Sequence, residues 1–152
     1  MRVRGITPIL NVSDVPRSIR WFESLGWKRG FAWNAGGLLQ EGSLANEHGD
    51  ATFGAVCAAG DTQIFLCRGG QGSRGTIMPK FPGDDETDGV WMSWWVDSVE
   101  SLESLHQNAL ALGYLVTMPP TDEPWGVREF HLRHPDGHMF RISAGLAPKE
   151  ST

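Results

Sequence analysis

The same order of predicted elements occurs twice along this 152-residue chain, and this repeat limits the fold more than any other feature. In the first half, residues 6–12 are typical of a strand. A helix follows, with Ser13 as a candidate N-cap, Pro16 just inside the start and Gly26 at the end. Further strands are predicted at residues 27–34, 51–58 and 62–68, the last two joined by a Gly60-Asp61 hairpin turn.

The second half repeats this order. Residues 90–96 are rich in side chains that favour strands, and Ser98 is a candidate cap for a helix that ends at Gly113. The residues expected to pack inward from this helix are Leu102, Leu105, Ala109 and Leu112, and those expected to face water are Glu100, Glu103, His106 and Gln107. Strands are then predicted at residues 114–118, 127–133 and 138–143. Each half is therefore predicted to be a βαβββ module in an α+β fold.

The remaining segments separate the chain into regions. Residues 1–68 form the first predicted module and residues 90–145 the second. Residues 69–89, rich in Gly, Pro and acidic side chains, are predicted to be a linker. Residues 146–152 are predicted to be a flexible tail, and residues 36–50 a long loop that acts as a flap.

Composition excludes several classes of partner. The net charge of −5 and the lack of long basic runs argue against a nucleic-acid-binding protein. No apolar run is long enough to cross a membrane, and the first residues lack the apolar core of a signal peptide, so a cytoplasmic protein is expected. In that compartment Cys57 and Cys67 are expected to be free thiols.

Tryptophan is unusually frequent, with seven in the chain. A tryptophan-rich core with a dimer interface would explain this, and so would an aromatic cleft for a flat ligand. Composition alone leaves both explanations open.

Two segments resemble the vicinal oxygen chelate superfamily, which contains glyoxalases, bleomycin resistance proteins and extradiol dioxygenases. Residues 9–27 resemble its opening strand and helix, which end in Leu-Gly-aromatic, and residues 124–138 resemble its closing hairpin. The hairpin usually reads Asp-Pro-Asp-Gly, and here His134 replaces the first Asp. The resemblance covers nearly the whole chain and implies two tandem βαβββ modules that form a curved mixed sheet around a cleft.

The resemblance also indicates where a metal would bind in the enzymes of this group. They hold a divalent ion with one residue from each of four strands, typically His, Glu or Gln, His and Glu. Counting from the two motifs places these positions at Thr7, at Phe65 (or Gln63 if the strand shifts by two), at Trp91 and at Arg141. An indole provides no metal ligand and a guanidinium is permanently cationic, so these residues argue against the shared metal chemistry.

Strand alternation predicts what lines the cleft instead. The residues expected to face it are Thr7, Gln63, Phe65, Trp91, Trp95, Met139 and Arg141, with Trp33 and Trp125 from a flanking strand and loop. Such a surface would bind a flat aromatic ligand and pair Arg141 with an acid, phenolate or carbonyl oxygen. Alternatively, Arg141 forms a structural ion pair with Glu129 or Asp97, and the tryptophans pack at a dimer interface.

The closing segment is most similar to that of bleomycin-binding members, which are metal-free dimers with Trp-lined grooves. This resemblance implies a homodimeric, metal-independent protein that binds an antibiotic or aromatic metabolite and confers resistance by sequestration, without catalytic residues or a cofactor. The alternative is a metalloenzyme of the same fold, a lyase, isomerase or dioxygenase, with a relocated metal site at Glu129 and His131. A regulatory or scaffold protein is a third possibility.

Overall fold

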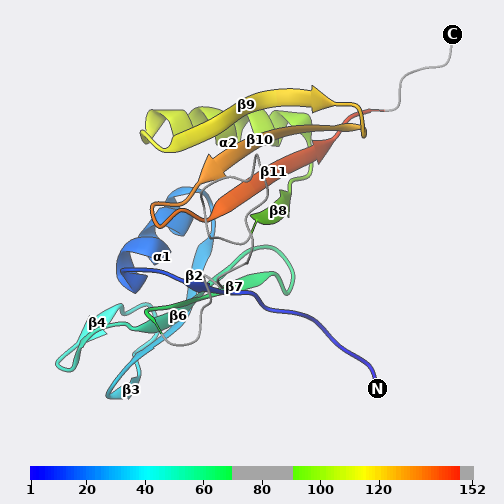
Figure 1. The fold of residues 1–152 in the computed structure, drawn as a ribbon. Helices are drawn as coiled ribbons and strands as arrows, with labels where there is room; N and C mark the ends of the chain where they lie inside the picture. Colours follow the sequence, from blue (N-terminus) through cyan, green and yellow to red (C-terminus); the bar gives the residue numbers. More distant parts are fainter. Residues whose placement is uncertain (70–90, 148–152) are drawn as a thin grey trace, which may run out of the picture. The chain divides into compact units, whose positions relative to one another are not determined.

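The structure is a computed structural model that describes residues 1–69 and 91–147. The chain divides into two compact units, Met1–Arg74 and Gly75–Thr152 (Figure 1). Apart from Gly69, the predicted linker at residues 69–89 lies outside the described residues. So do residues 148–152 of the predicted tail.

The N-terminal unit has the predicted βαβββ order. Its main elements are β1 (Ile9–Asn11), α1 (Val15–Ser24), β2 (Lys28–Asn34), β6 (Phe53–Cys57) and β7 (Gln63–Cys67). The sheet order is β1-β7-β6-β2-β3, in which β1 runs parallel to β7 and the other neighbours are antiparallel. The predicted flap contains three short strands, β3 (Gly37–Leu38), β4 (Ala45–Asn46) and β5 (Gly49–Asp50).

Helix α1 begins one residue later than predicted. Its N-cap is Asp14, whose carboxylate accepts a hydrogen bond of 3.0 Å from the backbone N–H of Arg17, and the prediction of Ser13 was therefore wrong. Both residues are good caps, and the carboxylate of Asp14 is the one that reaches an unpaired N–H of the first turn. Pro16 lies at the helix start, as expected.

Helix α1 packs on one face of the N-terminal sheet and buries the core there. Val15, Ile19 and Phe22 are all fully buried. Gly54 of β6 permits this close approach, because a Cβ at that position would lie 3.0 Å from Cδ1 of Ile19. Helix α1 does not cover the opposite face of this sheet.

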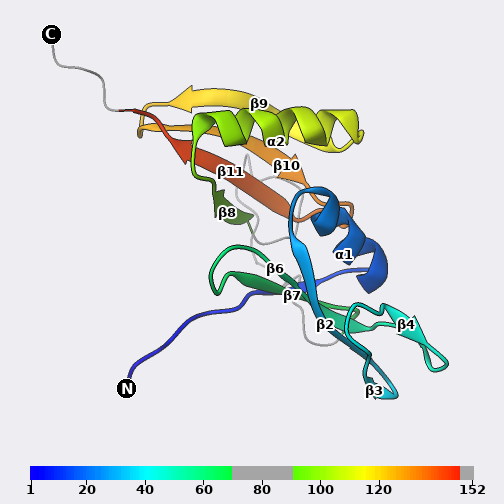
Figure 2. The same cartoon turned by 180° about the vertical axis from the view of Figure 1, so that it is seen from behind.

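The C-terminal unit repeats the order. It contains β8 (Trp91–Trp95), α2 (Val99–Ala111), β9 (Leu115–Glu123), β10 (Val127–Arg133) and β11 (Met139–Gly145). The sheet order is β8-β11-β10-β9, with β8 parallel to β11 and the other pairs antiparallel. Figures 1 and 2 show α2 lying along β9 and β10 on one face of this sheet. Together the two units confirm the predicted α+β fold of two βαβββ modules.

Strand β9 is longer than the predicted range of 114–118, since it continues to Glu123 through Pro119 and Pro120. The predicted strand ended at Met118, before these prolines. Proline cannot donate a hydrogen bond to a neighbouring strand and is rare inside a sheet. β9 is the last strand in its sheet, and edge strands tolerate proline.

Helix α2 begins as predicted, because Ser98 accepts a hydrogen bond of 3.0 Å from the backbone N–H of Ser101. The prediction that His106 faces water was wrong, since His106 is only 8% exposed and its ring lies 5.2 Å from that of Phe130. His106 lies four residues after Leu102 and three before Ala109, on the buried stripe of the helix. The prediction that Leu112 packs inward was also wrong, since Leu112 is the C-cap, where the helix ends, and is 45% exposed.

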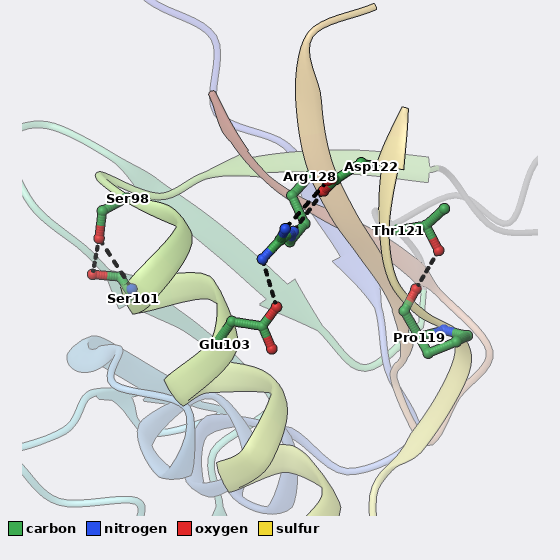
Figure 3. A network of polar contacts seen from close by, with 7 residues as sticks. All are labelled: Ser98, Ser101, Glu103, Pro119, Thr121, Asp122 and Arg128. Atoms are coloured by element: carbon green, nitrogen blue, oxygen red, sulfur yellow. Dashed lines mark hydrogen bonds and ion pairs between the residues drawn. The ribbon is translucent and has the colours of Figure 1, made fainter. Parts of the chain in front are cut away.

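A polar network ties α2 to the sheet (Figure 3). The guanidinium of Arg128 donates to Oδ1 of Asp122 at 2.6 Å and to Oε1 of Glu103 at 3.2 Å, which links β10 to β9 and to α2. The hydrogen bond from Arg128 holds the pKa of Asp122 below its usual range, and the bond to Asp122 in turn raises the pKa of Arg128.

Replacing Arg128 with methionine should raise the pKa of Asp122 back toward the ordinary aspartate range. Because this pKa is lowered in the folded protein, the ion pair stabilises the fold above the unfolded-state pKa, and this contribution is lost as pH falls through the folded-state pKa. The variant should therefore lose less stability on acidification. Carboxyl NMR titration of Asp122 measures the shift, and an unchanged titration would contradict the assigned cause.

Candidate functional site

In the C-terminal unit, four of the nine predicted ligand-binding residues lie on the sheet face opposite α2, namely Trp91, Trp95, Met139 and Arg141. Along β8, Trp91 and Trp95 are 46% and 69% exposed, whereas Trp94 between them is 9% exposed and lies 4.5 Å from the ring of Phe140. The predicted alternation on β8 is therefore confirmed. The surface formed by Trp91, Ser93, Trp95, Glu129, His131 and Arg141 is called the arginine face below.

Arg141 is the centre of the arginine face. In the register of β11 with β8, Arg141 pairs with Ser93, and its Nε and Nη2 donate to Oγ of Ser93 at 3.1 and 2.9 Å. Its Nε also lies 3.3 Å from Oε2 of Glu129. Of the two predicted ion-pair partners, the structure thus selects Glu129 rather than Asp97. The Arg141 side chain remains 43% exposed, so this ion pair does not prevent contact with a ligand.

Glu129 and His131 lie beside Arg141 on β10. The side chain of Glu129 is only 2% exposed, and its Oε2 lies 3.8 Å from Nε2 of His131. The indole of Trp91 meets the imidazole of His131 edge to face, with the ring centres 5.1 Å apart. A cation, a carboxylate, an imidazole and an indole therefore share one small area of the sheet.

These residues do not fit a divalent metal ion. Within residues 1–69 and 91–147, no group of three or more His, Cys, Asp or Glu side chains is placed to hold one. Glu129 and His131 supply two ligand types, but the neighbouring charged group is the guanidinium of Arg141, which repels a cation.

Two further predicted residues of this unit differ in exposure. Met139 pairs with Trp91 across β11 and β8 and so shares its face, but it is only 1% exposed. Trp125 lies in the turn between β9 and β10 and is 62% exposed. Trp125 is thus accessible, whereas Met139 is packed.

In the N-terminal unit, the structure brings Thr7 and Gln63 together. Nε2 of Gln63 lies 3.5 Å from Oγ1 of Thr7, at the limit of a hydrogen bond. The β1–β7 register pairs Ile9 with Phe65, which places Gln63 rather than Phe65 opposite Thr7. A hydroxyl and a neutral amide there form a weak ligand pair for a divalent ion.

Phe65 and Trp33 belong to an aromatic cluster on the sheet face opposite α1. Phe31 lies 5.4 Å from Phe65, 6.2 Å from Phe53 and 6.3 Å from Trp33, measured between ring centres. Trp33 is 46% exposed and Phe31 is 38% exposed. The surface formed by Phe31, Trp33, Phe53 and Phe65 is called the aromatic face below.

Three residues of these faces were not predicted: Phe31, Phe53 and Ser93 as a contact of Arg141. Phe31 precedes Trp33 by two positions on β2, so strand alternation alone indicates that they share a face. The place of Ser93 on the face of Trp91 and Trp95 follows from strand alternation, but its contact with Arg141 depends on the β8–β11 register. Phe53 joins the cluster through pairing between β6 and its neighbours, which the sequence of a single strand does not reveal.

The repeated βαβββ unit, with one sheet face covered by a helix and the other carrying the candidate residues, defines the class of fold. A family model described as Glyoxalase/Bleomycin resistance protein/Dioxygenase superfamily matches residues 5–142. The chain belongs to this superfamily. Neither helix in the described ranges has the length and apolar character needed to cross a membrane.

Solved structures share the fold at low sequence identity. TioX from Micromonospora sp. ML1 has 19% identity and a TM-score of 0.61, with 95% of this chain and 98% of that chain covered. A superfamily domain from Frankia sp. EAN1pec has 18% identity and a TM-score of 0.64, with 95% and 99% covered. A member from Sphaerobacter thermophilus has 19% identity and a TM-score of 0.60, with 93% and 98% covered. Comparison with curated proteins gave no match. These similarities establish the fold, and this fold hosts many different functions.

Proposed function

We propose that this protein binds an aromatic small molecule, an antibiotic or a related metabolite, without a metal ion and acts by sequestration. The proposal rests on one observation. The positions at which, by the family resemblance, the metalloenzymes of this group bind their ion are occupied here by residues that bind divalent metals weakly or not at all. In the C-terminal unit these positions hold Trp91 and Arg141, and the guanidinium is engaged by Ser93 and Glu129. An arrangement that repels a cation and exposes indoles favours organic ligands over metal chemistry.

The exposure of large aromatic side chains supports ligand binding. Trp91 and Trp95 are 46% and 69% exposed on one face, and Trp33 is 46% exposed on the other unit's sheet. On each sheet taken separately, large apolar side chains that stay exposed on one face often mark an interaction site. A flat ligand stacked on one of these indoles would cover that exposed ring and gain offset or edge-to-face contacts.

Sequestration requires only groups that bind a ligand, and the arginine face and the aromatic face both offer such groups. It requires a low dissociation constant and enough protein, and it requires no nucleophile or general base. The metalloenzyme alternative would rely on Glu129 and His131, next to the guanidinium of Arg141. Elemental analysis of purified protein tests that alternative, since stoichiometric metal that is lost in a Glu129→Ala variant would favour an enzyme.

Titration with flat aromatic compounds, in the absence of added metal, should quench the intrinsic tryptophan fluorescence. Replacing Trp91 with alanine should weaken binding by about 10- to 30-fold, the range typical of a central aromatic contact. Isothermal titration calorimetry measures the dissociation constant independently of the loss of a fluorophore.

Leu112→Ala is a matched control for that variant. Leu112 is the C-cap of α2 and is 45% exposed, close to the 46% of Trp91, but it does not belong to the arginine face. The proposal requires the control to bind like the unmodified protein. Equal weakening in both variants, or no response to a broad panel of aromatic compounds, would contradict it.

A further inference from the structure

The guanidinium of Arg141 is fixed in a defined orientation. Ser93 accepts hydrogen bonds from both Nε and Nη2, and Glu129 approaches Nε at 3.3 Å. Among the described residues, no acceptor forms a hydrogen bond with the third nitrogen, Nη1. One edge of the planar group is therefore held by the protein, while a donor remains for a partner from outside.

The distribution of charge on this face favours an anionic partner. The negative charge of Glu129 lies on a side chain that is only 2% exposed, whereas the Arg141 side chain is 43% exposed. A molecule that approaches the face therefore meets the cation before the carboxylate. By strand register Arg133, which is half-buried, shares the face with His131, while Glu123 lies at the other end of the sheet, opposite Val127.

The aromatic neighbour of this cation restricts the ligand further. Trp91 and Ser93 are alternate residues of β8, so the exposed indole and the guanidinium lie on the same face of adjacent strands. The indole of Trp91 is also held by a T-shaped contact with the imidazole of His131. A ligand that uses both groups needs a flat ring and an oxygen in or near the plane of that ring.

We infer that the arginine face selects aromatic molecules that carry an anionic oxygen, a carboxylate or a phenolate, which pairs with Nη1 of Arg141 while the ring stacks on Trp91. This inference rests on the proposed function and adds the chemical class of its ligand. Arg141 acts as the binding residue, and Ser93 acts as a positioning residue that holds its guanidinium. Charge-assisted hydrogen bonds to arginine are stronger than neutral ones, which gives the face a basis for discrimination.

The test compares three probes of nearly equal shape: 2-naphthoate, 2-naphthamide and 2-naphthylmethylammonium. At pH 7 they are anionic, neutral and cationic. Calorimetry on the full chain should show 2-naphthoate binding about fivefold more tightly than 2-naphthamide, a modest ratio because the Arg141 side chain is partly exposed to water. The ammonium probe should bind most weakly.

The variants are built so that no buried carboxylate is left unpaired. Glu129→Gln is the reference background, and Arg141→Met is introduced into it. Glu129→Gln should keep or increase the preference for 2-naphthoate, since the cation loses its partner. The double variant should bind the acid and the amide equally and still bind both. Ser93→Ala should reduce the preference with little effect on the affinity for the amide.

The outcomes separate this inference from the function on which it rests. If the protein binds naphthalene probes but does not prefer the acid, the inference is wrong and the proposed function stands. A preference for the acid that survives in the double variant also overturns the inference, because the guanidinium is then not its cause. If no aromatic probe binds, the proposed function fails and the inference fails with it.

Discussion

Replacing Arg141 with methionine should destabilise the folded protein by about 2–3 kcal/mol, a large effect for a side chain that is 43% exposed. The expected loss of stability comes from Glu129, the ion-pair partner, rather than from the contacts of Arg141 itself. The variant would leave the carboxylate of Glu129, which is 2% exposed, without the cation that lies 3.3 Å from it. An isolated buried charge is costly, and the partial exposure of Arg141 places the estimate below the full range for a buried pair. Urea unfolding followed by circular dichroism measures the change.

A second substitution tests this explanation directly. Adding Glu129→Gln to the Arg141→Met chain removes the stranded charge and should recover more than half of the lost stability. The double-mutant cycle with the single Glu129→Gln variant isolates the coupling between the two residues. If the losses from the two single substitutions simply add, Glu129 and Arg141 are not coupled and the ion pair does not stabilise the sheet.

The second large effect concerns Phe140, on the opposite face of the same strands. Phe140 is fully buried and its ring lies 4.5 Å from that of Trp94. Phe140→Ala should cost about 3–5 kcal/mol, through lost burial and the cavity left behind. Trp91→Ala, on the exposed face, should cost less than about 1 kcal/mol. Thermal unfolding of the two variants, together with their affinity for an aromatic probe, gives the comparison.

The two variants should show opposite behaviour. Phe140→Ala should lower stability and, below its unfolding temperature, retain most of the ligand affinity. Trp91→Ala should lose affinity and remain stable. If Trp91→Ala unfolds as readily as Phe140→Ala, Trp91 serves packing, and the dimer-interface or core explanation of the tryptophans gains support.

Much of the fold could be predicted because its signals are local. The range of β10, residues 127–133, was predicted from strand propensity and the Pro-Asp-Gly turn that follows it, and the structure confirms it. The alternation of Trp91, Ser93 and Trp95 follows from the two-residue period of a strand. Such features depend on neighbours in sequence, so a single chain reveals them.

The errors arose where the local signal was ambiguous or misread. Ser13 and Asp14 are both good caps, and only the backbone geometry of the first turn selects Asp14. His106 is polar, yet its position on the helix places it against Phe130. The length of β9 depends on its place at the edge of the sheet, which residues 114–123 do not encode by themselves.

The candidate site was harder to predict because it depends on pairing between strands. The sequence left Glu129 and Asp97 as alternative partners of Arg141. The β10–β11 register decides between them, since it places His131 opposite Arg141 and Glu129 two residues away. The choice of Gln63 as the residue opposite Thr7 likewise follows from the pairing of Ile9 with Phe65. Register joins segments that are distant in sequence, and one strand alone does not specify it.

The prolines of β9 have a consequence for the proposed sequestration, which requires a high concentration of the protein. A protein that neutralises a compound by holding it must accumulate to at least the concentration of that compound. Crowded sheet proteins are then at risk of joining edge to edge. Pro119 and Pro120 lie in the edge strand β9 and lack the N–H groups that an incoming strand would need. The two prolines therefore reduce the number of backbone donors that this edge of the C-terminal sheet offers to another strand.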